Sequence, residues 1–103
     1  MRTSGEKLKL ARDFLGLTQE QVASTLNLTS TILVNIENDK RIIKPGELLK
    51  FSKLYGISVE EIISDEKNVD ISTPMFARSY EKLSEKDKQE ILNLIKFKNS
   101  YKE

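Results

Sequence analysis

The sequence predicts an all-α protein that consists of a bundle of five helices and a C-terminal helical segment. Apolar residues recur every three or four positions through nearly the whole chain, and this spacing is typical of amphipathic helices. Residue types that favour helix starts and helix ends separate these stretches from one another. A length of 103 residues allows one compact domain with a modest core.

The first two helices are expected on either side of Gly16. The earlier one covers about residues 5–15 and ends at Gly16, because glycine adopts a left-handed conformation at little cost. The later one begins at Thr18, which has the spacing of a capping box with Gln21. It ends at Asn27, a residue type that tolerates a positive φ. The apolar stripes are Leu8, Ala11 and Leu15 in the first helix and Val22, Ala23 and Leu26 in the second.

Three more helices complete the expected bundle. A short helix covers about residues 29–38, with Thr29 as its N-cap. A fourth begins at Pro45, which suits a first helical turn, and a short fifth opens at the capping box that starts at Ser58. Leu48, Leu49, Phe51 and Leu54 define the fourth helix, and the residues expected to face inward from the other two are Leu33, Ile36, Val59, Ile62 and Ile63.

The rest of the chain is expected to form a linker and two helices. Residues 65–73 show no periodicity and are interpreted as a linker. Helices follow over residues 74–83 and 85–101, and Ser84 is expected to cap the second. The expected division is a domain of residues 1–66 and a linker with C-terminal helices over residues 67–103.

The composition excludes several classes of function. The chain has no Cys and no His, so thiol nucleophiles, imidazole bases and zinc sites built from these residues are absent. Neighbouring carboxylates such as Glu60 and Glu61 point about 100° apart on a helix and do not face each other. We therefore expect no enzyme, metal or cofactor. No apolar run approaches the ~20 residues of a membrane span and no signal peptide is present, so a cytoplasmic protein without membrane contact is expected.

The net charge does not by itself indicate a nucleic-acid partner, because it is only +1. Residues 1–66 hold nine Lys or Arg against ten Asp or Glu, whereas residues 67–103 hold eight against six. A DNA-binding function must therefore rest on where individual charges lie.

Residues 17–39, LTQEQVASTLNLTSTILVNIEND, have the pattern of two short helices that cross steeply. The crossing needs a small residue in the first helix and a turn residue that tolerates an unusual φ, which Ala23 and Asn27 supply. The second helix can then lie in a DNA major groove while the first braces across the phosphate backbone. A bundle without a DNA role is the alternative, and the exposed residues decide between the two.

An ordered set of residues extends this pattern over roughly residues 8–63. The set consists of Arg12, Leu17-Thr18-Gln19, Val22-Ala23, Leu28-Thr29, Ile36-Glu37-Asn38, Pro45, Leu48 and Tyr55-Gly56-Ile57-Ser58-Val59. It resembles the XRE family, the phage Cro and repressor class of helix-turn-helix proteins. Asn27 and Asp39 stand where this family usually has glycine. The resemblance implies a repressor-like five-helix fold and a regulator of this class that binds operator DNA.

The outward face of the third helix is predicted to read bases. Asn35 can pair in bidentate fashion with adenine, hydroxyl groups can bond several bases, and Val34 can contact a thymine methyl group. Three cations in the following loop suit phosphate contacts, although a solvated loop is the alternative. The resemblance adds phosphate contacts at the start of the second helix. The predicted DNA-binding residues are Thr18, Gln19, Thr29, Ser30, Thr31, Val34, Asn35, Asn38, Lys40, Arg41 and Lys44.

Other positions in this region point to structural roles or differ from the residue type usual in the family. Arg12 and Glu37 match a pair that forms a salt bridge in the family, so the resemblance assigns them to bracing the helices. Ile32 stands where the family more often has a small polar residue. Ile42 and Ile43 place two branched apolar residues in a loop, where they either tuck into the core or help to form an interface.

The C-terminal segment is interpreted as a dimerisation interface. The stripe of Ile91, Leu94 and Ile95 needs burial, and the linker would let it move independently of the bundle. One helix-turn-helix module also buries too little surface for strong specific binding. A chain that ends at Asp70 is accordingly expected to be a folded monomer. Packing of the segment against its own bundle is the alternative.

Two functions remain open on this evidence. In the first, the protein is a repressor that binds a palindromic operator as a homodimer and acts alone or is inactivated by proteolysis. In the second, it is an antitoxin that neutralises a protein toxin and represses its own operon. The second is suggested by residues 76–98, which resemble, more weakly, the tails of regulators encoded beside toxins or mobile-element metallopeptidases. The expected partners are double-stranded DNA, a second copy of the chain, and a toxin or protease.

Overall fold

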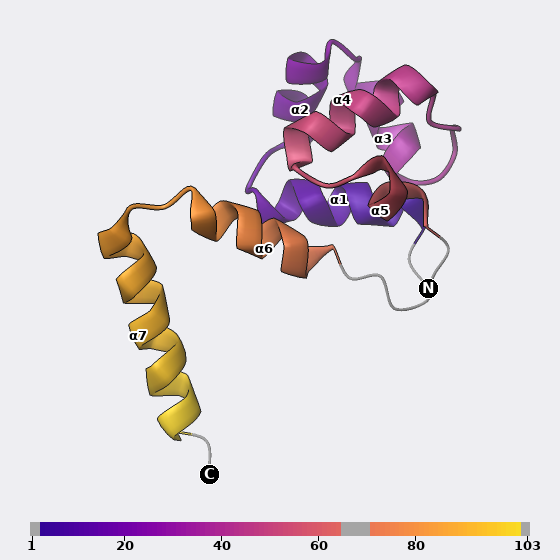
Figure 1. Ribbon diagram of the computed structural model, residues 1–103. Coiled ribbons are helices and arrows are strands. Elements are labelled where there is room, and N and C mark those ends of the chain that lie inside the picture. The colour runs from indigo at the N-terminus through magenta and orange to yellow at the C-terminus, as the bar shows by residue number, and fades with distance from the viewer. Residues whose placement is uncertain (1–2, 65–70, 102–103) are drawn as a thin grey trace.

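The computed structural model describes residues 3–64 and 71–101, apart from the side chain of residue 101. All regular structure in these ranges is helical, as the sequence predicts (Figure 1). The helices are α1 (Ser4–Phe14), α2 (Gln19–Leu26), α3 (Ser30–Glu37), α4 (Pro45–Tyr55), α5 (Val59–Ile63), α6 (Ser72–Glu81) and α7 (Glu85–Tyr101).

Hydrogen bonds at the helix starts confirm the expected caps. The Thr18 hydroxyl oxygen accepts the Gln21 N–H at 3.0 Å, while Gln21 Oε1 accepts the Thr18 N–H at 2.8 Å. Thr29 caps α3 by accepting a backbone N–H three residues further on at 3.2 Å. Ser58 forms the second expected capping box with Glu61. These side chains satisfy N–H groups that have no partner within the helix.

The core lies between α1 and the helices that surround it. Phe51 and Tyr55 of α4 stack with 5.8 Å between ring centroids. The other buried apolar residues are Leu8, Ala11, Val22, Ala23, Leu26, Leu33, Ile36, Ile57, Ile62, Ile71 and Met75. Two expected inward positions are wrong, since Ile63 is 50% exposed and Leu15 is 37% exposed. Both stand at the last turn or cap of a helix, where the chain already turns away from the core.

Helix α6 packs against α1 and completes this core (Figure 1). Ile71 and Met75 are each only 2% exposed and belong to the core cluster. Residues 65–70 of the expected linker lie outside the described residues, but Ser72 and Thr73 form the first turn of α6. The interpretation of residues 71–73 as linker, and of α6 as independent of the bundle, is therefore wrong.

Helix α7 projects away from the bundle (Figure 1). Ser84 caps it, as expected, by accepting the Asp87 N–H at 3.1 Å. Among the side chains of residues 85–100, only Lys88 and Ile91 are half-buried, and the rest are exposed. Although α7 is long, neither it nor any other helix in the described ranges is long and apolar enough to cross a membrane.

Candidate nucleic-acid interface

Helices α2 and α3 form the expected helix-turn-helix. Asn27 ends α2 in the left-handed conformation, with φ 59° and ψ 42°. The turn is closed where the Leu28 N–H donates to the Ala23 carbonyl at 2.8 Å. Ala23 is 2% exposed, so a small residue stands where the two helices approach each other. The local sequence thus produces the crossing that a recognition helix needs.

The side chains expected to read bases lie on the solvent side of α3. Ser30 and Thr31 are exposed, whereas Val34 and Asn35 are half-buried. Among the described residues, the hydroxyls of Ser30 and Thr31 and the amide of Asn35 have no intramolecular partner. These groups are therefore available to hydrogen-bond base edges.

Three other predicted DNA-binding residues take part in helix ends. The hydroxyl oxygens of Thr18 and Thr29 accept capping hydrogen bonds, which leaves their protons for a phosphate oxygen. Asn38 is the exposed C-cap residue of α3. Thr29 and Asn38 stand at the two ends of α3 and Thr18 at the start of α2, so all three have a structural role in the helix ends.

Arg12, Glu37 and Gln19 are brought together in a cluster that joins α1, α3 and α2. Arg12 Nε lies 2.8 Å from Glu37 Oε2, and Arg12 Nη2 lies 3.2 Å from Oε1. Gln19 Nε2 donates to the same Oε1 at 3.1 Å. The Glu37 and Arg12 side chains are 1% and 11% exposed, and the hydrogen bonding of Arg12 to the Glu37 carboxylate raises the pKa of Arg12. Gln19, predicted only as a phosphate contact, thus ties α2 to this ion pair.

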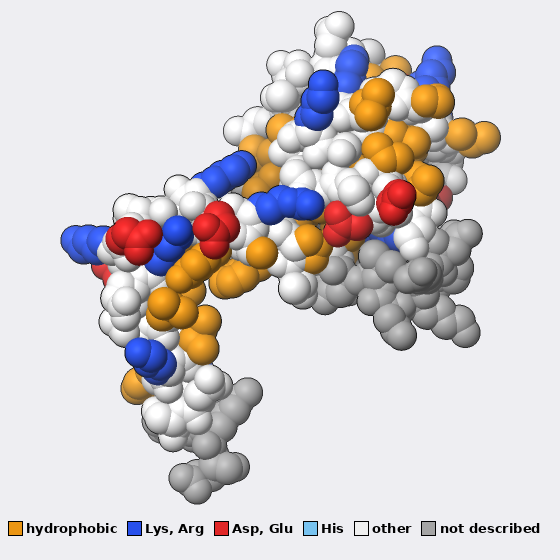
Figure 2. All heavy atoms as spheres, viewed as in Figure 1, with side chains coloured by type: hydrophobic (Ala, Val, Ile, Leu, Met, Phe, Trp, Pro, Cys, Tyr) orange, Lys and Arg blue, Asp and Glu red, His pale blue; other side chains and the backbone are white. Residues whose placement is uncertain are grey.

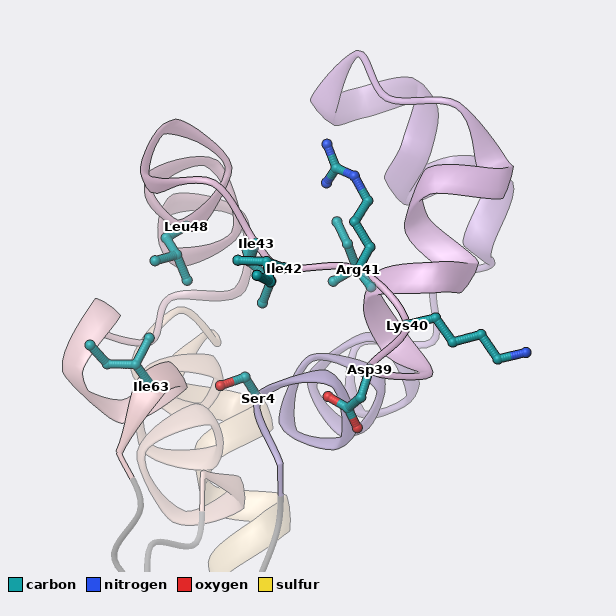
Figure 3. Close-up of a pocket in the computed structure, with 9 residues that line it drawn as sticks. Ser4, Asp39, Lys40, Arg41, Ile42, Ile43, Leu48 and Ile63 are labelled. Atoms are coloured by element: carbon teal, nitrogen blue, oxygen red, sulfur yellow. The ribbon is translucent and has the colours of Figure 1, made fainter.

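Of the three cations in the loop between α3 and α4, two have no carboxylate partner among the described residues. Lys40 and Lys44 are exposed, and Figure 3 shows the Lys40 side chain extending away from the protein. Arg41 Nη1 instead donates to Glu47 Oε1 at 2.8 Å, and this hydrogen bond lowers the pKa of Glu47. The same carboxylate oxygen accepts the Lys44 N–H at 2.9 Å. A phosphate group would have to compete with Glu47 for Arg41.

The two isoleucines of this loop behave differently. Ile43 packs partly buried against the core, whereas Ile42 is 89% exposed. Ile42 borders a hollow of about 410 Å³ that is also lined by Leu48 and Ile63 (Figure 3). Ile32 of α3, which stands where the family more often has a small polar residue, also packs against the core. An apolar residue at that position is therefore compatible with the fold.

Sequence reasoning missed a contact between the start of α1 and the end of α3. The Gly5 N–H donates to Asp39 Oδ1 at 3.1 Å, and the Thr3 hydroxyl donates to Asp39 Oδ2 at 2.5 Å. A Cβ atom at Gly5 would lie 2.5 Å from the Ile36 carbonyl oxygen, so the approach requires glycine. The available signal was the glycine itself, which is unfavourable inside a first helical turn.

Lys7 is a second residue that sequence reasoning missed. It is 1% exposed, and its Nζ donates to the carbonyls of Glu61 at 3.0 Å and Ser64 at 2.6 Å. The ammonium group therefore satisfies carbonyls at the end of α5. A lysine beside Leu8 looks like part of a solvated face, so nothing in the local pattern marks it.

The predicted dimerisation residues lie on α7, apart from the helix-turn-helix. Leu94 and Ile95 are 56% and 44% exposed, and Ile91 is half-buried. None of the three belongs to the core cluster. They remain available for contact with another chain.

The chain is similar to known helix-turn-helix proteins. A family model described as a helix-turn-helix domain matches residues 5–68. The HTH-type transcriptional regulator ImmR of Bacillus subtilis (strain 168) is 36% identical over 63 residues, which cover 61% of this chain and 50% of ImmR. Control protein C.MunI of Mycoplasma sp is 39% identical over 62 residues, covering 59% of this chain and 84% of that protein. The matched part thus spans half the length of ImmR and most of C.MunI.

Two solved structures share the fold over nearly the whole chain. A chain titled SinR protein/SinI protein complex has a TM-score of 0.59 and 21% identity, covering 93% of this chain and 97% of that one. A transcriptional regulator from Listeria innocua has a TM-score of 0.58 and 19% identity, covering 98% of this chain and 97% of that one. At these identities the likeness concerns the fold.

Proposed function

Because this chain belongs to the XRE-type helix-turn-helix family of DNA-binding transcriptional regulators, we propose that it is a repressor that binds operator DNA as a homodimer. The observation that carries the proposal is the exposed face of α3. Ser30, Thr31 and Asn35 present hydrogen-bonding groups with no partner among the described residues. In the free protein these side chains are hydrogen-bonded to water, and base edges can replace that water once α3 lies in a major groove.

Reading and anchoring fall to different side chains in this proposal. Asn35 and its neighbours on α3 read bases, while Lys40 and Lys44 neutralise phosphates beside them. Arg41 is held by Glu47 at 2.8 Å and helps to fix the loop rather than to supply a free charge. The free cations of the interface are few, so affinity depends on placing two copies on one duplex.

Two copies imply a palindromic operator, because two-fold symmetry of the protein requires two-fold symmetry of the site. The half-sites then lie about one helical turn apart, roughly 34 Å. The exposed apolar residues Leu94 and Ile95 on α7 support a dimer through the C-terminal segment.

Titration of labelled DNA, after selection of bound duplexes from a random pool, tests the reading role of Asn35. The Asn35→Ala variant should lose about 1–3 kcal/mol of affinity and relax preference at one base position, because its bidentate contact is removed. Unchanged affinity and unchanged base preference would show that α3 does not read DNA in this register.

The same titration at several salt concentrations tests the anchoring role of Lys40. Lys40→Ala should weaken all sequences about equally and reduce the slope of log K against log salt by about one. Lys53→Ala is the matched control, since Lys53 is an exposed lysine of α4 outside the predicted interface. Equal effects of the two variants on the slope would contradict the proposed phosphate contact.

Neutralisation of a protein toxin is the second candidate function. It is favoured by the exposed apolar side of α7 and by the likeness to a chain whose title names a complex of two proteins. Co-expression with the product of a neighbouring toxin gene tests it. A stable complex that is lost in Leu94→Asp would support this function, and a toxin that stays unbound would exclude it.

A further inference from the structure

One carboxylate holds an arginine of the proposed interface in place. Arg41 Nη1 donates to Glu47 Oε1 at 2.8 Å, and the two side chains are only 26% and 11% exposed. The same oxygen accepts the Lys44 N–H at 2.9 Å, at the start of α4. Because the first turn of α4 fixes this carboxylate, Glu47 cannot follow Arg41 towards a phosphate group. Arg41 must therefore leave Glu47 before it can bind a phosphate.

Arg41 differs in this respect from its neighbour Lys40. Figure 3 shows the two side chains extending from the loop in different directions, with Lys40 directed away from the protein. Among the described residues, the Lys40 ammonium group has no carboxylate partner, so its charge is available to a phosphate group. The Arg41 guanidinium carries the same charge, but Glu47 neutralises it. The loop thus contains one cation whose charge is cancelled within the protein.

One additional free cation would matter for DNA binding by this chain. Residues 1–66 hold nine Lys or Arg against ten Asp or Glu. Figure 2 shows Lys and Arg side chains scattered among apolar and acidic ones on the face in view, rather than gathered into one patch. Sequence-independent binding to DNA depends almost entirely on such charges. Glu47 therefore withholds one of the three loop cations from binding that ignores sequence.

Operator and random DNA would gain unequally from a free Arg41. On an operator, the contacts of α3 with bases fix one register, so the guanidinium meets only the phosphate that this register places near it. On random DNA the chain can shift along the duplex until the guanidinium reaches a phosphate. A free Arg41 would accordingly stabilise complexes on the wrong sequence more than the complex on the operator.

From these observations we propose that Glu47 is a positioning residue that determines specificity, because it keeps Arg41 from the phosphate backbone and so limits binding to DNA of the wrong sequence. The inference rests on the proposed operator binding and adds to it a residue outside α3. Glu47 acts through Arg41 and itself contacts neither bases nor phosphates.

Replacing Glu47 by Gln tests this role, because glutamine keeps the acceptor at the start of α4 but not the charge. The chain already uses glutamine in this way, since Gln21 Oε1 accepts the Thr18 N–H at the start of α2. On random duplex, Glu47→Gln should steepen the slope of log K against log salt by about 0.9 for each chain bound, which is a further ~3.5-fold loss of affinity between 50 and 200 mM salt. The ratio of operator affinity to random affinity should fall by about twofold or more at low salt.

Two controls separate this role from a general effect of charge. Glu61→Gln makes the same change of charge in the capping box of α5, where Arg78 Nη2 lies 3.8 Å from Glu61 Oε1, and should leave the slope unchanged. The double variant Arg41→Met and Glu47→Gln should restore the slope of the parent chain, because the released cation is gone. A loss of stability caused by Glu47→Gln is common to the single and double variants, so it cancels when they are compared.

Three outcomes would overturn the proposal. The first is an unchanged slope in Glu47→Gln, and the second is a steeper slope that persists in the double variant, which would assign the effect to the lost carboxylate itself. The third is weaker binding of Glu47→Gln to random duplex, which would show that Glu47 presents Arg41 to a phosphate. In each case operator binding by the parent chain leaves the proposed function intact. A parent chain that binds no duplex overturns both.

Discussion

Replacing Arg12 by Met should destabilise the fold more than replacing Glu37 by Met, although both variants lose the same ion pair. The Glu37 side chain is 1% exposed and, without Arg12, keeps one side-chain partner among the described residues, the Gln19 amide at 3.1 Å. Arg12 is 11% exposed and, without Glu37, keeps the Leu17 carbonyl at 3.0 Å and the Asp13 carboxylate at 3.5 Å. A buried charge without partners is the costlier outcome.

The expected magnitudes follow from that asymmetry. Loss of one partner from a buried ion pair costs about 3–5 kcal/mol of stability. Arg12→Met should therefore cost about 4 kcal/mol, and Glu37→Met, which leaves the more exposed partner, about 2 kcal/mol. The double variant leaves no unpaired charge, but Gln19 and the Leu17 carbonyl each lose a hydrogen bond, so about 1–2 kcal/mol remains. The double variant therefore falls roughly 4 kcal/mol short of the sum of the single variants.

Thermal melts followed by circular dichroism would measure these differences, since about 1 kcal/mol shifts the Tm of a domain of this size by roughly 4–8 °C. The pair formed by Arg78 and Glu61 is the control, because its atoms lie 3.8 Å apart and its side chains are 47% and 27% exposed. Its coupling should stay below about 1 kcal/mol. Additive effects of Arg12→Met and Glu37→Met, or equal costs for the two, would refute the reasoning.

Two further substitutions probe the core. Gly5→Ala should cost about 2–3 kcal/mol in urea unfolding, because its Cβ would lie 2.5 Å from the Ile36 carbonyl oxygen, whereas Gly46→Ala, with nothing within 4 Å, should not destabilise. Tyr55→Phe should stabilise by about 1 kcal/mol, since the buried hydroxyl has no partner among the described residues. Burial also raises the pKa of Tyr55. The un-ionised side chain therefore contributes stability below pH 10.0, and this contribution is lost as the pH rises above that value. The stability of the Phe variant should lack this dependence on alkaline pH. Equal Tm values for Gly5→Ala and the parent, or an equal loss of Tm at alkaline pH in Tyr55→Phe and the parent, would contradict these expectations.

Features that depend on residues close in sequence were predictable. The capping boxes at Thr18 and Ser58 and the left-handed turn at Asn27 involve residues within four positions of one another, so the pattern determines them. The outward face of α3 also follows from helical spacing, once Leu33 and Ile36 are known to point inward.

Features that depend on distant contacts were not predictable. Lys7 is buried because its ammonium group meets carbonyls more than fifty positions away, and the local pattern gives no sign of them. Asp39, at a position where the family usually has glycine, has a φ of 60°, but its carboxylate also accepts the Gly5 N–H at the start of α1, which no local pattern indicates.

The candidate interface shows the same division. Sequence reasoning counted Arg41 among the loop cations but could not tell that Glu47, six positions on, would hold its guanidinium. Ile71 illustrates the limit for the fold, because one isoleucine beside a polar stretch carries no periodicity and yet is 2% exposed in the core.

The boundary of the folded domain follows from Ile71 and Met75. A chain that ends at Asp70 lacks both residues, and loss of a buried residue of this size costs about 2–5 kcal/mol. Small domains have about 5–15 kcal/mol of stability in total, so this chain should melt far below the full-length protein or be largely unfolded. A chain that ends at Leu83 keeps α6 on α1 and lacks only the exposed α7.

The chain that ends at Leu83 should therefore stay folded, become monomeric and bind the operator more weakly than the full chain. Melting temperature and sedimentation of the two truncations, measured side by side, distinguish loss of the core from loss of the dimer. If the two truncated chains have the same melting temperature, α6 adds nothing to the core and the domain boundary lies near residue 66. If only the shorter chain unfolds, weak operator binding by the longer one reports dimerisation alone, because its recognition helix and core are intact.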